Sequence, residues 1–193
     1  IPYPAGLAVI SDQGRDKLLI ANNLSDNVVL LDVASGKILQ TFDLSTSDLV
    51  PSSFPYTVVA TRDGRRAWCS LWNASQVAEL DLTSGKVARW IKLKQPADPL
   101  APGSHPTAIL LSPDEKTLYV ALSNIDEVAA VSTDDGNPLQ FFATTAPKQK
   151  FAGSYPTALG QTSDGKRLFA ADSTLDAIAV FEFAQSAAAA DST

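Results

Sequence analysis

Residues 54–93 read FPYTVVATRDGRRAWCSLWNASQVAELDLTSGKVARWIKL, and this stretch decides the fold. It contains four short runs rich in β-branched, aliphatic and aromatic residues, and a polar turn follows each of the first three. The first turn contains Asp63-Gly64, a pair that supplies the positive φ angles of tight hairpins. The third run, Val77 to Leu82, alternates apolar and polar residues in its second half, which is typical of a half-buried strand. The stretch therefore predicts a four-stranded antiparallel meander.

The same pattern occurs four times along the chain, at intervals of about 50 residues. A fixed period of this size indicates a repeat architecture, and four strands per repeat predict the blades of an all-β propeller. The copies span residues 3–44, 54–93, 105–144 and 155–183, so we predict one propeller domain over residues 1–183. Each copy begins with a ring-bearing residue followed by proline, at Tyr3-Pro4, Phe54-Pro55, His105-Pro106 and Tyr155-Pro156.

The fourth copy is shorter than the others. It supplies three strands and then enters the alanine-rich residues 184–193, which we interpret as a tail or linker. The last blade is therefore predicted to be incomplete, whereas closed propellers contain about 4–8 whole blades. Because a repeat array needs capped ends and none is visible, we expect the chain to be part of a larger ring. A complete four-bladed ring and a half-ring that closes by dimerising remain alternatives.

The repeats resemble the YVTN-type repeat of bacterial β-propellers. The resemblance rests on second-strand segments such as Leu118-Tyr119-Val120-Ala121, and on turns such as Leu80-Asp81-Leu82-Thr83-Ser84-Gly85-Lys86. It covers residues 3–183, although Phe169-Ala170-Ala171-Asp172 departs from the pattern in the fourth copy. The resemblance implies a seven-bladed type of ring in a bacterial protein. The chain is also similar to the propeller part of bacterial propeller/phosphoesterase proteins.

Composition excludes several classes of function. The net charge is −6 and the cations are scattered over turns, so we expect no nucleic-acid binding, which depends on clustered cations. No run of 18 apolar residues occurs, so no membrane span is expected. The chain starts at Ile1 and contains no methionine, which favours a processed, secreted or excised product. Together with the family resemblance, this predicts a periplasmic or extracellular location.

Few residues suit catalysis or metal binding. His105 is the only histidine, so a catalytic triad or a two-histidine metal site is hard to build. The innermost runs contain no Asp, Glu, Asn or His, and Gln161 is their only amide, so a calcium-bound lactonase-type centre lacks its ligands. Cys69 lies among apolar residues and is expected to be a buried, inert thiol. We therefore predict no catalytic residue, metal or cofactor in this chain, although its status as an enzyme stays open.

Most carboxylates lie in the turns that join the predicted strands. Short polar side chains in turns commonly accept hydrogen bonds from the backbone of their own turn. We therefore expect Asp12, Asp63, Asp114 and Asp164 to cap the first turn of each copy, and Asp26, Asp126 and Asp176 to do the same in the second turn.

The residues before the prolines are the candidate contact site. Tyr3, Phe54, His105 and Tyr155 share one repeat position, so we expect them to form an arc at the mouth of the central channel. They either pack against the proline loops or bind a ligand or partner. Trp72 replaces the polar Asn23, Ser123 and Ser173 of the other copies, which indicates an exposed contact residue. The proline-rich loops 45–54, 94–105 and 145–155 should project from the same face, where function is often located.

These features predict a non-catalytic β-propeller binding or scaffold module of an extracytoplasmic bacterial protein. Its partner would be another protein, or the remaining blades or a further domain of a longer polypeptide, contacted through the loop-rich face. The alternative is a fragment of a propeller enzyme, either a lactonase-like or phosphoesterase-linked hydrolase or the heavy subunit of a periplasmic oxidoreductase. Its active site would then be completed outside this chain. Uncovered blade faces would also favour self-association.

Overall fold

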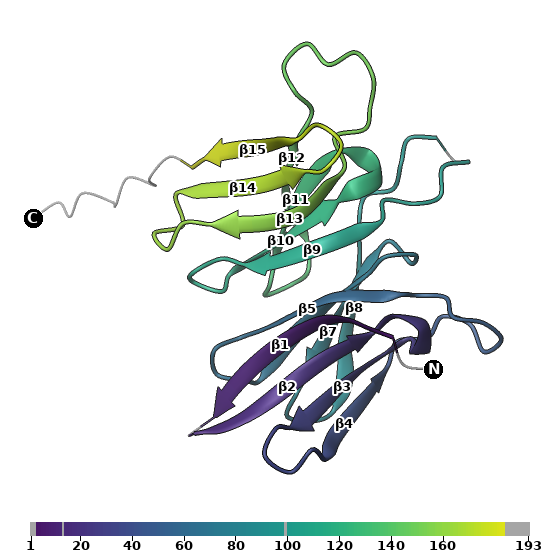
Figure 1. Ribbon diagram of the computed structural model, residues 1–193, viewed down its shortest axis with the longest axis vertical. Coiled ribbons are helices and arrows are strands. Elements are labelled where there is room, and N and C mark those ends of the chain that lie inside the picture. Colours follow the sequence, from purple (N-terminus) through teal and green to yellow (C-terminus); the bar gives the residue numbers. More distant parts are fainter. Residues whose placement is uncertain (1–2, 13, 99, 184–193) are drawn as a thin grey trace, which may run out of the picture.

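The computed structural model describes residues 3–12, 14–98 and 100–183. Within them the chain forms four separate antiparallel sheets, and the strands of each sheet follow one another in chain order (Figure 1). The helices of the described residues are single 3₁₀ turns, η1 (Asn23–Ser25) and η2 (Ser123–Ile125). The predicted all-β propeller class and its consecutive meanders are confirmed. The predicted alanine-rich tail, 184–193, lies outside the described residues.

Each sheet is one blade, and its first strand starts at a proline. Blade 1 contains β1 (Pro4–Asp12), β2 (Arg15–Asn22), β3 (Asn27–Asp32) and β4 (Ile38–Asp43). Blade 2 contains β5 (Pro55–Ala60), β6 (Arg66–Leu71), β7 (Gln76–Asp81) and β8 (Lys86–Lys92). Blade 3 contains β9 (Pro106–Leu111), β10 (Thr117–Leu122), β11 (Glu127–Ser132) and β12 (Pro138–Ala143). Blade 4 contains β13 (Pro156–Gln161), β14 (Arg167–Asp172) and β15 (Ala177–Glu182).

The first hairpin of a blade closes through its own aspartate, as predicted. In blade 2 the Asp63 carboxylate accepts hydrogen bonds from the Thr61 hydroxyl at 2.6 Å and the Arg65 N–H at 3.0 Å. These bonds hold the pKa of Asp63 below its usual value. Asp114 and Asp164 do the same in blades 3 and 4. The side chain of Asp12 lies outside the described part of the structure.

The first strands are the innermost ones, because each lies beside the first strand of the next blade: β1 by β5, β5 by β9 and β9 by β13. The closest approach is at Gly6, where a Cβ atom would lie 2.4 Å from the carbonyl oxygen of Tyr56. Only glycine lets the two backbones come this near. The strands of one blade thus fan outwards from a shared inner edge (Figure 1).

The core is divided among the seams, a seam being the contact between two consecutive blades. One apolar cluster fills each seam, and the buried thiol of Cys69 belongs to the first. The second seam also holds Glu79, which is 4% exposed and pairs with Arg66 at 2.8 Å and Arg89 at 3.4 Å. Arg66 lies over the Trp68 ring, 4.7 Å from its centroid, so the buried carboxylate is neutralised inside the seam.

Two faces at the ends of the arc are apolar and uncovered. Leu7 and Val9 of blade 1 are 63% and 66% exposed, and Ile178 and Val180 of blade 4 are 58% and 51% exposed. The same repeat positions are buried or half-buried where a neighbouring blade covers that side. Val58 and Ile109, which match Leu7, are 2% and 5% exposed, and Val28, Val77 and Val128, which match Ile178, are 0% exposed. These two surfaces, called the end faces below, therefore have the side-chain pattern of a seam.

Candidate functional site

The loop that enters blade 2 is held by an aspartate of blade 1. The buried Asp26 carboxylate accepts hydrogen bonds from the N–H groups of Ser52 at 2.5 Å, Ser53 at 3.1 Å and Phe54 at 3.0 Å. The hydroxyls of both serines donate to it as well, each at 3.0 Å. Three successive backbone N–H groups around one anion form a nest. One side chain thereby fixes the direction in which the Phe54 ring leaves the backbone.

The later blades repeat this contact. Asp126 accepts hydrogen bonds from Gly153 N–H at 2.6 Å and Tyr155 N–H at 3.1 Å, and the Ser75 hydroxyl accepts one from Ser104 N–H at 3.0 Å. The prediction that Asp26 and Asp126 cap their own turn is therefore wrong. The incoming loop offers these carboxylates several converging donors, which their own turn does not. A signal for this contact exists in the sequence, because the fully buried Ser53, Ser104 and Ser154 each precede the ring and proline.

The anchored residues have a strained backbone. Phe54, His105 and Tyr155 have φ angles of 52°, 48° and 55°, in the left-handed region, although each precedes a proline. Such a conformation costs a bulky residue about 1–2 kcal/mol. A hydrogen bond to a charged acceptor contributes about 1.5–3 kcal/mol, so the anchoring outweighs the strain around Asp26 and Asp126. The same unusual conformation at three equivalent positions points their rings in equivalent directions.

Three of the five predicted contact residues meet in one stack. The Trp72 and His105 rings lie 3.9 Å apart between centroids with 20° between their planes, and Phe54 lies 6.3 Å from Trp72 at 28°. The backbone N–H of Trp72 donates a 3.0 Å hydrogen bond to the Phe54 carbonyl, which holds Trp72 to its own blade. Since His105 belongs to blade 3, the stack crosses the seam between blades 2 and 3. We call this group the mouth stack.

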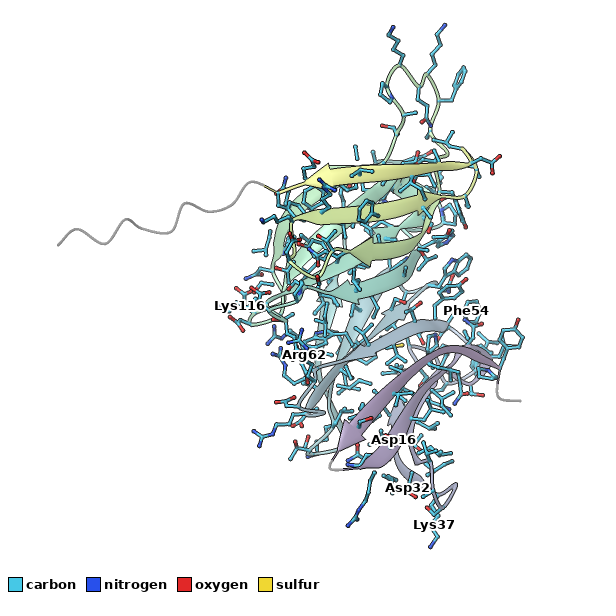
Figure 2. The ribbon with its side chains drawn as sticks, turned by 60° about the vertical axis from the view of Figure 1, so that its left-hand side comes forward. Asp16, Asp32, Lys37, Phe54, Arg62 and Lys116 are labelled. Atoms are coloured by element: carbon cyan, nitrogen blue, oxygen red, sulfur yellow. The ribbon has the colours of Figure 1, made fainter. Side chains whose placement is uncertain are left out.

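The members of the mouth stack differ in exposure. His105 is only 7% exposed, whereas Phe54 and Trp72 are half-buried. Burial lowers the pKa of the His105 imidazole, and a hydrogen bond to the Pro102 carbonyl opposes this shift. The ring is therefore neutral at pH 7 and presents a flat apolar face to Trp72. Figure 2 shows Phe54 at the edge of the molecule opposite to Arg62 and Lys116, so the stack lies away from the first hairpin turns.

The other two predicted contact residues lie outside the stack. Tyr3 is 59% exposed and Tyr155 is half-buried, at the matching positions of blades 1 and 4. The structure thus brings together the rings of blades 2 and 3 only. Trp72 joins these two rings, and the other blades have Asn23, Ser123 and Ser173 at the position of Trp72.

Among the described residues, no group of three or more His, Cys, Asp or Glu side chains could hold a metal ion, and no helix is long and apolar enough to cross a membrane. The expectation that the chain binds no metal and no cofactor stays a prediction. Cys69 is buried, and burial raises the pKa of its thiol to about 12, which confirms the prediction of an unreactive cysteine.

A family model described as "Lactonase, 7-bladed beta-propeller" matches residues 9–191. The chain belongs to this lactonase propeller family. The resemblance of its repeats to a bacterial β-propeller is confirmed by this match and by the fold. A search of curated proteins found no match.

Solved structures show the same fold at low sequence identity. Hydrazine synthase from Kuenenia stuttgartiensis has a TM-score of 0.70 and 22% identity, over 88% of this chain and 42% of that chain. Virginiamycin B lyase from Staphylococcus aureus has a TM-score of 0.67 and 18% identity, over 95% and 56%. A streptogramin B lyase gives 0.67 and 18%, over 98% and 58%. The chain therefore spans about half the length of these propeller proteins, and the likeness concerns the fold alone.

Proposed function

We propose that this chain is a non-catalytic binding module of a lactonase-family propeller and contacts a protein partner through the mouth stack. The observation that carries the proposal is the stacking of Phe54, Trp72 and His105 across a seam, on a strained and anchored backbone. The remaining blades of a longer polypeptide would cover the end faces, and the mouth would stay free for the partner.

The chemistry of the stack suits a contact surface. Aromatic side chains offer a large contact area at a small cost in conformational entropy, and tryptophan is enriched among the residues that dominate binding energy. Trp72 is half-exposed at a position that is polar in the other blades. A tryptophan there gains little for the fold if a serine suffices elsewhere. The anchored loops also hold the rings in place before binding, which lowers the cost of association.

An enzymatic role remains the second candidate, because the matching family is one of lactonases. Such a role would require catalytic groups from outside this chain, since Asp12 at the end of β1 is the one acidic residue of the described inner strands and none of them contains histidine. The phosphoesterase-linked and oxidoreductase alternatives rest on resemblance only. Fold by itself does not establish a reaction.

We further propose a periplasmic or extracellular location, supported by the resemblance to YVTN-type repeat proteins. Fractionation of a native bacterial host with an antibody against the chain would test this proposal. Protein recovered with the periplasm or medium supports it, and protein confined to the cytoplasmic fraction contradicts it.

Site-specific cross-linking tests the binding role. The photoreactive residue p-benzoylphenylalanine would replace Tyr3 or Tyr155 at the mouth, and Trp90, which is 41% exposed on β8, as the matched control. We expect one common cross-linked protein from both mouth positions and none of it from Trp90. The proposal fails if the mouth positions give no product or if Trp90 gives the same one.

The cross-linked partner then allows an affinity measurement. Trp72→Ala should weaken its binding by about 1 kcal/mol or more, that is at least about fivefold, while circular dichroism confirms the β fold. A variant that melts earlier but binds equally well would assign the stack to packing. Hydrolysis of γ-butyrolactone by the purified full-length protein would instead favour the enzymatic candidate.

A further inference from the structure

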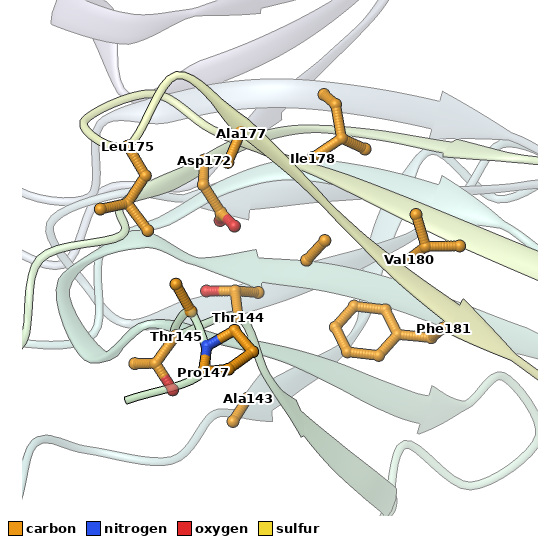
Figure 3. Close-up of a pocket in the computed structure, with 12 residues that line it drawn as sticks. Ala143, Thr144, Thr145, Pro147, Asp172, Leu175, Ala177, Ile178, Val180 and Phe181 are labelled. Atoms are coloured by element: carbon orange, nitrogen blue, oxygen red, sulfur yellow. The ribbon is translucent and has the colours of Figure 1, made fainter. Parts of the chain in front are cut away.

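A cavity of about 330 Å³ lies at the seam between blades 3 and 4. Residues 143–147, which are the last residue of β12 and the loop after it, form one side of the cavity. The segment from Asp172 along β15 to Phe181 forms the other side (Figure 3). Asp172 is only 2% exposed, yet its Oδ1 atom has no hydrogen-bond partner. Figure 3 shows the carboxylate pointing into the cavity, towards Thr144. A buried acceptor without a donor costs free energy, so this carboxylate requires a physical reason.

The other two seams are apolar at the same place. Leu44 and Leu71 belong to one apolar cluster at the first seam, and Leu93 and Leu122 belong to another at the second. The matching pair at the third seam is Thr144 and Asp172. The equivalence is structural, because Leu44, Leu93 and Thr144 each donate their N–H to the carbonyl of the turn residue, Asp26, Ser75 and Asp126. Two leucines have thus been replaced together by two polar residues.

A third difference opens the cavity. Asp172 pairs with Ala177 in the strand ladder, whereas the matching partners in the other blades are the longer Asn27, Gln76 and Glu127. The short Ala177 side chain leaves space beside the carboxylate. Thr144, Asp172 and Ala177 therefore distinguish this cavity from the matching places at the other two seams.

The electrostatics of the cavity favour a positive guest. Burial raises the pKa of Asp172, the nearby Asp126 carboxylate raises it further, and a hydrogen bond with Thr144 opposes both effects. The Thr144 hydroxyl also lies 2.6 Å from the Ser154 hydroxyl. These groups provide acceptors and two neighbouring negative charges. A cation with its own N–H donors would satisfy Oδ1 and relieve the repulsion between the two carboxylates.

We propose that this cavity binds a small alkylammonium ion, with its ammonium group on Asp172 and Thr144. An ammonium group supplies three donors, enough for Oδ1 and a neighbouring oxygen. The alkyl chain would lie against Pro147 and Phe181, which line the cavity (Figure 3). Its volume is near the lower end of the range for ligand sites, about 300–1,000 Å³, so the guest is small.

Ligand-observed NMR with n-butylamine and the full chain tests the proposal. We expect binding to the wild type, and affinity reduced at least about tenfold in Asp172→Asn, since the neutral amide loses the charge-assisted bond. Asp176→Asn is the matched control, because Asp176 is exposed on the same blade, and it should bind like the wild type. Uncharged n-butanol at the same ionic strength should bind at least about tenfold more weakly than the amine.

A double variant keeps the test valid if Asp172→Asn does not fold. Thr144→Leu/Asp172→Leu restores the leucine pair of the other seams, so it should fold, melt at a higher temperature and bind no butylamine. Equal binding of n-butylamine by the wild type and either Asp172 variant would overturn the proposal. Equal binding of butanol and butylamine, or no binding of butylamine by the folded wild type, would overturn it as well.

Discussion

Asp26 and Asp126 act on the blade that follows them rather than on their own turn. Asp26 accepts three backbone and two hydroxyl hydrogen bonds from residues 52–54, and Asp126 holds the loop before Tyr155 in the same way. Blade 2 uses Ser75 for this purpose, with one shorter side chain and one bond. At the residue scale, the directions of the Phe54, His105 and Tyr155 rings are therefore set by a side chain from the preceding blade.

Removing one anchor should destabilise the chain. In Asp26→Ala, the N–H groups of Ser52, Ser53 and Phe54 lose their acceptor, so we expect the free energy of unfolding to fall by about 2–4 kcal/mol. Asp32→Ala is the control, because Asp32 accepts hydrogen bonds from Ser35 in an exposed turn and its loss should have a much smaller effect. Urea denaturation of both variants measures the difference. Equal losses would show that the Asp26 network does not hold the loop.

His105 makes stability depend on pH. Its pKa is lowered in the folded chain, because burial disfavours the charged imidazole. Above the unfolded value of about 6.5 the ring is neutral in both states, and its contribution is complete. As the pH falls below that value, the unfolded chain binds the proton more readily, so stability is lost.

A variant at His105 can test this pH dependence of stability. We expect the melting temperature of the wild type to fall more between pH 7 and pH 5 than that of His105→Phe, which keeps a stacking ring without a titrating group. Both proteins retain Asp172, whose raised pKa acts in the opposite direction and cancels in the comparison. An equal fall in melting temperature for the two proteins between pH 7 and pH 5 would contradict this role of His105.

At the scale of strands, the chain follows its sequence closely. The strand runs and the Asp63-Gly64 type of turn are local signals, and they placed the strands of blade 2 within about two residues of the observed β5 to β8. The contacts across seams were not predictable in the same way. The reach of Asp26 to residues 52–54 and the pairing of Thr144 with Asp172 depend on how one blade docks on the next. The shared repeat position predicted a common direction for the rings, but not that Trp72 would join only two of them.

Gly6 and Gly160 test how closely the inner strands pack. A Cβ at Gly6 on β1 would meet the backbone of β5 at 2.4 Å, whereas a Cβ at Gly160 on β13 would have no atom within 4 Å. We therefore expect Gly6→Ala to lower the free energy of unfolding by about 2–3 kcal/mol through overpacking. Gly160→Ala should leave it unchanged or raise it by about 0.4–1 kcal/mol, because alanine restricts the unfolded chain. Thermal denaturation measures the stability of both variants. Equal changes in stability would contradict the close approach of β1 and β5.

As a whole, the described chain is an open arc of propeller blades with two uncovered end faces. Leu7 and Val9 occupy positions that are buried or half-buried in the blades that have a preceding blade, and Ile178 and Val180 occupy positions that a following blade buries. The chain matches a seven-bladed family and about half of the length of the solved propellers. A face of blade 4 thus suits the opposite face of any blade 1, whether it comes from the same polypeptide or from another copy. Head-to-tail contacts of this kind close into rings or grow into chains.

Sedimentation equilibrium of the isolated 193-residue chain examines this arc directly. With both end faces uncovered, we predict an average mass that exceeds 20.4 kDa and rises with protein concentration in the micromolar range. The double variant Val9→Lys/Val180→Lys should stay at 20.4 kDa, and Leu49→Lys, which changes a 92% exposed leucine in the loop between β4 and β5, should associate like the wild type. A wild-type chain that remains folded and sediments at 20.4 kDa at every concentration would contradict the open arc.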